Sequence, residues 1–149
     1  MDTNLLLLFF VGYYDRGLIE RWPRTAGRFA SVDYDTLLLL LEGFDKIVVT
    51  PHILTEVSNM LGYLAEPAKT ECRVRLALVI RTLMEETRTP GTDLIELRAY
   101  LPFGIADASI SDAATDTYLV LTDDFDLYGY LQNEGVGVLN FNQIKGLAY

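Results

Sequence analysis

Residues 46–50 read KIVVT, and Pro51 follows them directly. A short run of β-branched residues without polar alternation indicates a buried strand. Thr50 is a preferred residue type at a helix N-cap and proline is favoured at the first helical position, so we expect a helix to begin at Pro51. The apolar residues of this segment recur on one helical face: Ile53, Leu54, Val57 and Leu61. A strand that leads directly into a helix is the unit from which α/β folds are built.

A second strand and helix follow the same plan near the end of the chain. Residues 118–121 (YLVL) predict a buried strand, residues 122–124 (TDD) an acidic turn, and a short helix is expected to reach Glu134. A last strand is expected over residues 136–141. Further helices are expected over residues 33–43 and 70–86, and from about Asp107. Apolar strands that alternate with helices predict the α/β class, with a parallel sheet covered on both faces, in one domain over residues 1–149.

The composition and the net charge limit the classes of function that this chain can have. Half of the 149 residues are hydrophobic by type, which predicts a packed core. The formal net charge is -9, whereas proteins that bind nucleic acid by neutralising phosphates are usually basic. A metal-dependent nuclease is compatible with this charge, because its acids gather cations and the cations meet the phosphate. The single cysteine, Cys72, can form no internal disulfide and no zinc cluster, so we expect a cytoplasmic protein.

The apolar run from Leu5 to Val11 is of ambiguous secondary structure. It lacks the basic flank and the small-residue cleavage site of a secretory signal. It is also too short to cross a bilayer, so no membrane association is expected. We interpret this run as part of the core.

Carboxylates follow the predicted strands at the edge where α/β sheets bind their ligands. Asp123 and Asp124 come directly after YLVL, and Glu56 lies in the second turn of the helix after KIVVT. Asp107 stands near the start of a helix, and Asp2 near the start of the chain. Each acid alone has an ordinary interpretation as a helix cap, a loop residue or a solvated helix residue. Together they predict a metal site, because clustered carboxylates repel unless a cation neutralises them, and oxygen ligands suit Mg²⁺ or Mn²⁺.

Four short segments resemble, in this order, the acidic motifs of the PIN-domain family. They are MDTNLL at residues 1–6, VVTPHILTEVSN at 48–59, IADASI at 105–110 and LVLTDDF at 119–125. One such motif is a weak signal, whereas four in the right order are fairly specific, and together they run over essentially the whole chain. The resemblance implies a three-layer α/β/α fold with a central parallel sheet. It also implies metal-dependent ribonuclease activity, which is common among the toxins of bacterial and archaeal toxin–antitoxin pairs.

The resemblance also implies roles for single residues. The positions that match the metal-binding acids of the family are Asp2, Glu56, Asp107 and Asp124. Asn4 and Thr122 match the polar residues that support them, and Asp123 is an additional acid that could replace its neighbour as a ligand. A metal-bound water would attack the RNA phosphodiester, with Asp123 or Asp112 holding such a water from the second layer of residues. The expected partners are an RNA substrate, an antitoxin protein and a second copy of the chain.

This sequence departs from the family pattern at one point, the first motif. In PIN proteins the first acid ends a central strand, whereas only Met1 precedes Asp2 here. We expect either that this strand lies upstream of the sequence or that the sheet lacks it, which would leave strand edges unpaired and the domain less stable. The run from Leu5 to Val11 decides the consequence for the site. As a helix it leaves Asp2 beside the other acids, and as the central strand it moves Asp2 to the opposite edge.

One stretch of this acidic chain is locally basic. It consists of four arginines around the only tryptophan: Arg16, Arg21, Trp22, Arg24 and Arg28. Two interpretations are about equally supported. The arginines could contact RNA phosphates while a base stacks on Trp22, or the stretch could be a solvated loop that Trp22 anchors in the core.

Two other functions fit part of the pattern. A phosphatase resembling the haloacid dehalogenase superfamily would use Asp2, Thr50 and the paired acids after YLVL. However, Asn4 stands where that family has a second acid, and Glu56 and Asp107 would have no role. The other alternative is a catalytically inactive PIN-like module that binds a partner protein, which the departure at the first motif favours.

Overall fold

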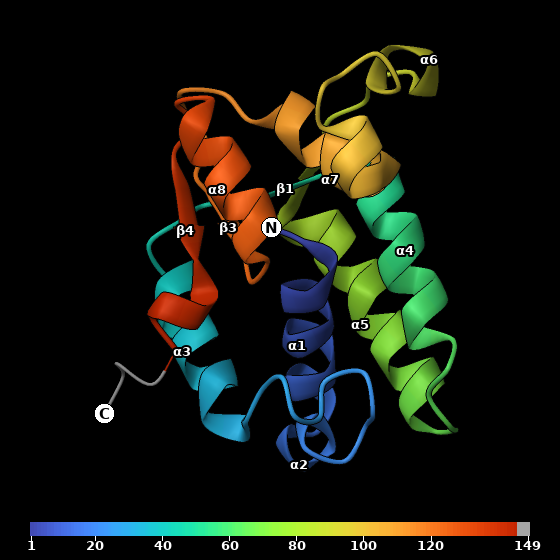
Figure 1. The fold of residues 1–149 in the computed structure, drawn as a ribbon. Helices are drawn as coiled ribbons and strands as arrows, with labels where there is room; N and C mark the ends of the chain where they lie inside the picture. Colours follow the sequence, from blue (N-terminus) through green and yellow to red (C-terminus); the bar gives the residue numbers. More distant parts are fainter. Residues whose placement is uncertain (146–149) are drawn as a thin grey trace.

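The computed structural model describes residues 1–145 (Figure 1). The helices are α1 (Thr3–Tyr14), α2 (Arg16–Ile19), α3 (Ser31–Leu41), α4 (Pro51–Leu61), α5 (Ala68–Thr82), α6 (Gly91–Leu94), α7 (Tyr100–Ala113) and α8 (Phe125–Asn133), with the 3₁₀ helix η1 (Phe141–Gln143). The strands are β1 (Ile47–Val49), β2 (Met84–Glu86), β3 (Val120–Thr122) and β4 (Val138–Asn140).

Helix α1 lies at the centre of the protein, between α3 on one side and α4 and α5 on the other (Figure 1). Every residue from Leu5 to Gly12 is buried, so the prediction that this run belongs to the core is confirmed. A helix that is apolar all round needs such cover on every face. At Gly12 a Cβ atom would lie 2.3 Å from Cδ2 of Tyr34, so only glycine allows α3 to pack this closely. Within residues 1–145, no helix has the length and apolar character needed to cross a membrane.

The strands form two parallel sheets of two strands each. In one sheet β1 pairs with β2, and Ile47 stands opposite Met84. In the other sheet β3 pairs with β4, and Val120 stands opposite Val138. The described residues therefore make a mixed α/β protein with parallel pairing, as the sequence predicted. The described residues contain no single central sheet that joins these two pairs of strands. The three-layer arrangement therefore stays a prediction.

Two predicted helix boundaries are wrong. The helix expected over residues 70–86 ends at Thr82, and Met84–Glu86 forms β2. Pairing with β1 outweighs the helical preference of this Met-Glu-Glu segment. The helix expected from about Asp107 begins earlier, at Tyr100, but Gly104 interrupts it with φ 83° and ψ 178°, a conformation that favours glycine. The regular turns that carry Asp107 therefore start just after Gly104.

Three helices begin next to the candidate site, and each has a side-chain cap. Thr50 accepts a hydrogen bond from the Ile53 amide at the start of α4, where Pro51 is the first residue as predicted. Asp2 caps α1, and Asp124 caps α8. Helix N-termini carry partial positive charge, so they stabilise carboxylates placed near them. The local sequence signals thus bring acids to the first turns of helices.

Candidate functional site

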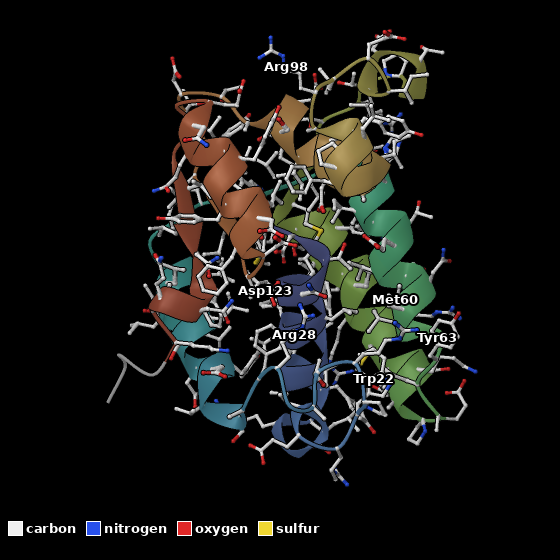
Figure 2. The ribbon with its side chains drawn as sticks, in the orientation of Figure 1. Trp22, Arg28, Met60, Tyr63, Arg98 and Asp123 are labelled. Carbon is white, nitrogen blue, oxygen red and sulfur yellow. The ribbon has the colours of Figure 1, made fainter. Side chains whose placement is uncertain are left out.

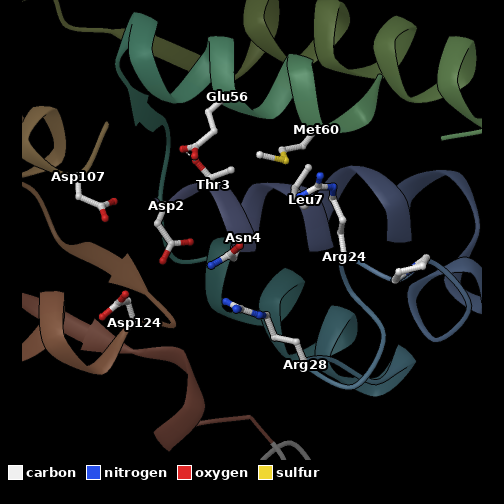
Figure 3. A pocket seen from close by; sticks show the side chains of 11 residues that line it. Asp2, Thr3, Asn4, Leu7, Arg24, Arg28, Glu56, Met60, Asp107 and Asp124 are labelled. Atoms are coloured by element: carbon white, nitrogen blue, oxygen red, sulfur yellow. Dashed lines mark hydrogen bonds between the residues drawn. The ribbon is translucent and has the colours of Figure 1, made fainter. Parts of the chain in front are cut away.

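One pocket brings the four predicted acids together (Figure 3). It is a cavity of about 330 Å³, and its acidic lining consists of Asp2, Glu56, Asp107 and Asp124. These residues belong to four segments that are far apart in the sequence: the N-cap of α1, the helices α4 and α7, and the N-cap of α8. Because the Leu5–Val11 run is helical, Asp2 lines the same pocket as the other acids, which meets the first condition for the predicted site.

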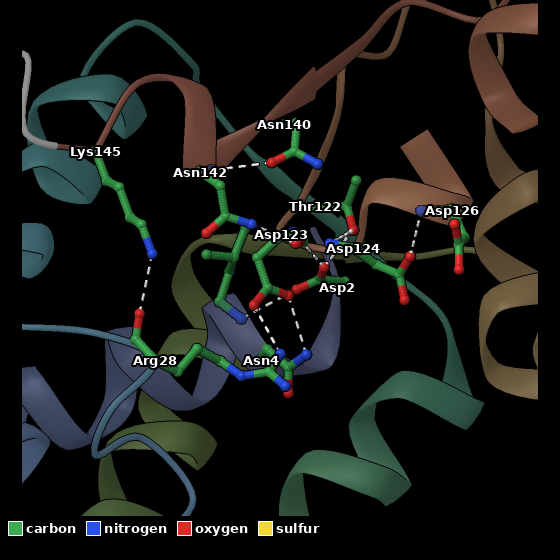
Figure 4. Close-up of polar contacts among 11 residues, drawn as sticks. Asp2, Asn4, Arg28, Thr122, Asp123, Asp124, Asp126, Asn140, Asn142 and Lys145 are labelled. Atoms are coloured by element: carbon green, nitrogen blue, oxygen red, sulfur yellow. Dashed lines mark hydrogen bonds and ion pairs between the residues drawn. The ribbon is translucent and has the colours of Figure 1, made fainter. Parts of the chain in front are cut away.

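Asp2 connects helix α1 to the end of strand β3 (Figure 4). Its Oδ1 accepts from the Leu5 amide at 3.0 Å. Its Oδ2 accepts from Oγ1 of Thr122 at 2.6 Å and from the Asp123 amide at 2.9 Å. Burial and, to a lesser extent, the charge of Asp123 raise the pKa of Asp2 to about 6, while these hydrogen bonds oppose the shift. Asp2 therefore has both a structural and an electrostatic role, and Thr122 supports it as predicted.

Asp107 is the most perturbed carboxyl group of the pocket. Burial, and after it the charges of the neighbouring acids, raise its pKa to about 7; these acids contribute in the order Asp2, Asp124, Glu56 and Asp123. Its side chain makes no hydrogen bond within residues 1–145, so it points into the pocket without a partner (Figure 3). A carboxyl group in such surroundings must bind either a proton or a cation near neutral pH.

Glu56 and Asp124 complete the acidic lining, and each already has a protein partner. Glu56 Oε2 accepts from Oγ1 of Thr3 at 2.6 Å. Asp124 Oδ1 accepts from the amides of Asp126 and Leu127 at the start of α8. Asp124 is exposed, and its second oxygen has no hydrogen-bond partner in the described part of the chain. That oxygen is therefore free to bind a ligand while Oδ1 continues to cap the helix.

The carboxylate oxygens of the pocket are suitable ligands for Mg²⁺ or Mn²⁺, although the four acids lie farther apart than the ligands of a bound ion. All four pocket acids offer oxygen ligands, which these ions prefer. Among the described residues, no three acidic, histidine or cysteine side chains lie close enough together to hold an ion as they stand. Carboxylates that no cation neutralises repel each other, and the Thr3 hydroxyl holds Glu56 to one side. Binding an ion would therefore require side-chain rotation at Glu56, which costs little for a flexible residue on a helix surface.

Asp123 has a different role from Asp124. Its side chain is only 2% exposed, and its oxygens accept from Nδ2 of Asn4 at 3.0 Å and from Nη1 of Arg28 at 2.7 Å (Figure 4). It does not line the acidic pocket, whereas Asp124 does. The question of which acid faces the pocket is thus answered in favour of Asp124. Asn4 lines the pocket and donates to Asp123, so its predicted partner among the pocket acids is not the one it contacts.

The basic stretch, which contains Trp22 and Arg28 (Figure 2), divides into two parts by its contacts. Trp22 is 7% exposed and packs in the core, which favours the interpretation as a core anchor over the one in which a base stacks on it. Arg16 forms an ion pair with Asp35, and Arg21 forms one with Asp15. Neither of these arginines lines the pocket. This part of the stretch matches the interpretation as a solvated loop with a tryptophan anchor.

Arg24 and Arg28 belong to the second part, and both line the acidic pocket opposite the carboxylates (Figure 3). Arg28 is held by the buried carboxylate of Asp123, and Lys145 Nζ donates to its carbonyl. The Arg24 guanidinium lies 4.6 Å from the centre of the Tyr63 ring, which is 69% exposed. A pocket with acids on one side and guanidinium groups on the other can bind a metal ion and a phosphate side by side.

Sequence reasoning missed Thr3, Tyr63 and the outward position of Asp112. Thr3 stands between Asp2 and Asn4 in the first motif, so its place in the pocket could have been expected from its neighbours. Tyr63 left no signal, because an exposed tyrosine after Gly62 is an ordinary loop residue. Asp112 accepts from Thr89 on the surface and does not line the pocket, so its predicted second-layer role is wrong.

Comparisons with known proteins give no further assignment for this chain. No protein-family model, no curated protein and no solved structure matches it significantly.

The raised pKa values predict how stability depends on pH in the absence of metal. The folded protein keeps protons on Asp2 and Asp107 up to about pH 6 and about pH 7, whereas the unfolded chain releases them near the ordinary value of 3.8. Unfolding therefore releases protons in this window, and the free energy of unfolding is expected to fall as pH rises from about 4 to about 7. Urea denaturation at several pH values in EDTA measures this slope. A slope that is unchanged in Asp107→Asn would contradict the assignment.

Proposed function

We propose that this protein is a metal-dependent endoribonuclease of the PIN type, which hydrolyses RNA phosphodiesters with Mg²⁺ or Mn²⁺. The observation that carries the proposal is the convergence of Asp2, Glu56, Asp107 and Asp124 from four segments around one pocket. The raised pKa of Asp107, caused by burial and by the other acids, supports a cation as the missing partner of this cluster. The four motifs that resemble those of the PIN family supply the reaction class.

The residues of the pocket would have different roles in the reaction. Asp107 and the free oxygen of Asp124 are most available to a metal ion. Asp2 is fixed by its own hydrogen bonds, and Glu56 is held by Thr3 and would have to rotate away from it to become a ligand. A bound ion would lower the pKa of a water molecule and stabilise the charge that develops on the phosphate. Arg28 would orient a phosphate at the mouth of the pocket, because its partner Asp123 fixes the guanidinium there. These arginines offset the repulsion that RNA meets from a chain of net charge -9.

The alternative phosphatase has weaker support. Such an enzyme would need Thr50 in the pocket, but Thr50 is buried, caps α4 and shares a hydrogen bond of 2.6 Å with Ser109. It would also need Asp2 as a nucleophile, yet both oxygens of Asp2 accept hydrogen bonds from the protein. Trapping of a phosphorylated Asp2 would favour this alternative over the nuclease.

Several parts of the proposal stay predictions. The three-layer PIN architecture, the role as the toxin of a toxin–antitoxin pair, and the partnership with an antitoxin and a second copy of the chain follow from the resemblance, and the cytoplasmic location follows from the single cysteine. A metal titration distinguishes the nuclease from the alternative, an inactive PIN-like module. The inactive module would show no carboxylate-dependent affinity for Mn²⁺. Cleavage of a labelled RNA in Mn²⁺, and its loss in EDTA, tests the activity itself.

A thermal shift with Mn²⁺ tests the metal site without any assumption about the substrate. An ion that binds only the folded state stabilises it by about 2.7 kcal/mol at roughly one hundred times its dissociation constant. For a protein of this size we expect the melting temperature to rise by roughly 5–10 °C. Asp107→Asn is the matched control and should reduce the shift strongly. If millimolar Mn²⁺ leaves the melting temperature of the parent protein unchanged, the site does not bind the metal.

A further inference from the structure

An exposed aromatic side chain stands at the border of the acidic pocket. Phe125 is the first residue of helix α8 and directly follows Asp124, one of the four pocket acids. Phe125 is 58% exposed, and it is not among the residues that pack in the core of residues 1–145. Single exposed apolar residues are common on protein surfaces, so what Phe125 can bind depends on its neighbours.

Phe125 lines a second cavity, which adjoins the acidic pocket. We name it the Phe125 cavity; its volume is about 460 Å³, and its lining includes charged and amide side chains such as those of Asn142 and Lys145. Arg28 and Asp124 line both this cavity and the acidic pocket. A ligand that extends out of the acidic pocket past these two residues would therefore enter the Phe125 cavity.

Two cations of the Phe125 cavity are held in place by other parts of the protein (Figure 4). The Arg28 guanidinium forms an ion pair of 2.7 Å with Asp123, whose side chain is buried. Lys145 Nζ donates to the Arg28 carbonyl at 3.0 Å, and this bond uses only one of its three N–H donors. Asn142 Nδ2 donates to the Asp123 carbonyl, which fixes the 3₁₀ helix η1 that precedes Lys145. Both cations therefore face the same cavity from fixed positions, which suits the binding of a phosphate group.

The charges around the Phe125 cavity are divided between its two sides. Figure 4 shows Arg28 and Lys145 on one side of Asp123 and Asp126 on the other. Asp126 lies in the first turn of α8, next to Phe125 in the sequence. A phosphate group would be attracted to the side of Lys145 and repelled from that of Asp126. The Phe125 ring, in contrast, carries no charge and offers a flat face on which a nucleobase can stack.

We propose that the Phe125 cavity is a nucleotide-binding subsite, which holds the nucleotide next to the scissile phosphate of the RNA. The phosphate of this nucleotide would lie between Arg28 and Lys145, and its base would stack on the Phe125 ring. This inference rests on the proposed nuclease function, because it names where the substrate continues beyond the acidic pocket. Every base has a flat face, and the ring forms no hydrogen bond that would select one base, so the subsite accepts all four. It also gives RNA a cationic contact beside the acids of a chain with net charge -9.

Binding of two RNA probes in EDTA, where no metal-dependent cleavage can occur, tests the base contact. The probes are a fluorescently labelled oligoadenylate and an abasic oligomer of the same length, which keeps the phosphates and lacks the bases. In fluorescence anisotropy, Phe125→Ala should weaken the binding of oligoadenylate by roughly five- to tenfold, because a stacking contact is lost. The same variant should bind the abasic oligomer as the parent protein does. Phe125→Trp keeps an aromatic face and should retain the affinity for oligoadenylate.

The phosphate contact is tested with Lys145→Gln on the same two probes. This variant should weaken the binding of both probes equally. It should also reduce the slope of log affinity against log salt concentration by about 0.7, the value for one phosphate contact of a single strand. Phe44→Ala is the matched control, because Phe44 is also an exposed phenylalanine but lines a different cavity. It should leave the affinity for both probes unchanged.

The subsite is overturned if Phe125→Ala leaves the affinity for oligoadenylate unchanged or weakens both probes equally. An unchanged salt slope in Lys145→Gln, or a parent protein that does not bind oligoadenylate at all, would also overturn it. The rise in melting temperature with Mn²⁺ is measured on the same variants, because it depends on the pocket acids and not on Phe125. A protein that shows this rise, but binds RNA independently of Phe125, keeps the proposed metal site and loses the subsite. The reverse result keeps the subsite and counts against the metal-dependent nuclease.

Discussion

The Asp107→Asn variant is expected to cleave RNA at least about a hundredfold more slowly than the parent protein in Mn²⁺ while keeping its fold. Asparagine preserves the shape of the side chain and removes the negative charge that a metal ligand needs. The Asp107 side chain makes no hydrogen bond within residues 1–145, so no structural contact is lost. Single-turnover cleavage of a labelled RNA measures the rate, and circular dichroism checks the fold.

The same substitution should also make the metal-free protein more stable near neutral pH. It removes a carboxyl group whose pKa is raised by burial and by the charges of the other pocket acids. Asp112→Asn is the matched control, because Asp112 lies on the same helix but bonds to Thr89 at the surface. Cleavage by Asp107→Asn at the parent rate would show that Asp107 takes no part in the reaction.

Substitution of Asp2 should damage both activity and stability. In Asp2→Ala, the Leu5 amide loses its cap, and the Asp123 amide and the Thr122 hydroxyl lose their acceptor. Loss of an N-cap costs about 1 kcal/mol, and a buried amide left without a partner costs about 1–3 kcal/mol. Relief of the repulsion with Asp123 offsets part of this, so we expect a net loss of about 2 kcal/mol in the free energy of unfolding near pH 8.

Asp2→Asn separates the structural from the electrostatic role of this residue. Its side-chain oxygen can still cap α1, and the rotatable Thr122 hydroxyl can accept from the new amide group. The Asp123 amide, however, faces an NH₂ group instead of an oxygen. We therefore expect a smaller loss of stability than in Asp2→Ala, with cleavage reduced as strongly. If urea denaturation shows that Asp2→Ala is as stable as the parent, the observed hydrogen bonds of Asp2 contribute nothing to the fold.

Local sequence signals were sufficient to place two of the pocket acids, Glu56 and Asp124, on their elements. The β-branched run of β1, the cap at Thr50 and the proline at Pro51 predicted the strand and the helix that carries Glu56, and the structure confirms both. The YLVL segment predicted β3 and the acidic turn that leads to Asp124. These features depend on neighbouring residues only, because caps, turns and β-branched runs act over one or two turns of the chain.

Only the tertiary structure decided what the apolar run from Leu5 to Val11 becomes. Such a short run fits a buried strand and a buried helix equally well, and its helical form is stabilised by the helices that pack around α1. The strand β2 was missed for a related reason. Its Met-Glu-Glu sequence has no strand signal of its own and is extended because β1 lies beside it.

The sequence by itself thus determined which acids stand at the starts of helices and near the ends of strands, since those positions follow from local patterns. The tertiary structure alone decided which polar side chains share the pocket. It directs Asp123 to Arg28 and away from the pocket, sends Arg24 into it, and buries Trp22 in the core. The pair of Asp123 and Arg28 joins residues 95 positions apart. Contacts of this kind depend on how whole helices pack against each other. The residues next to each partner in the sequence therefore give no signal that predicts them.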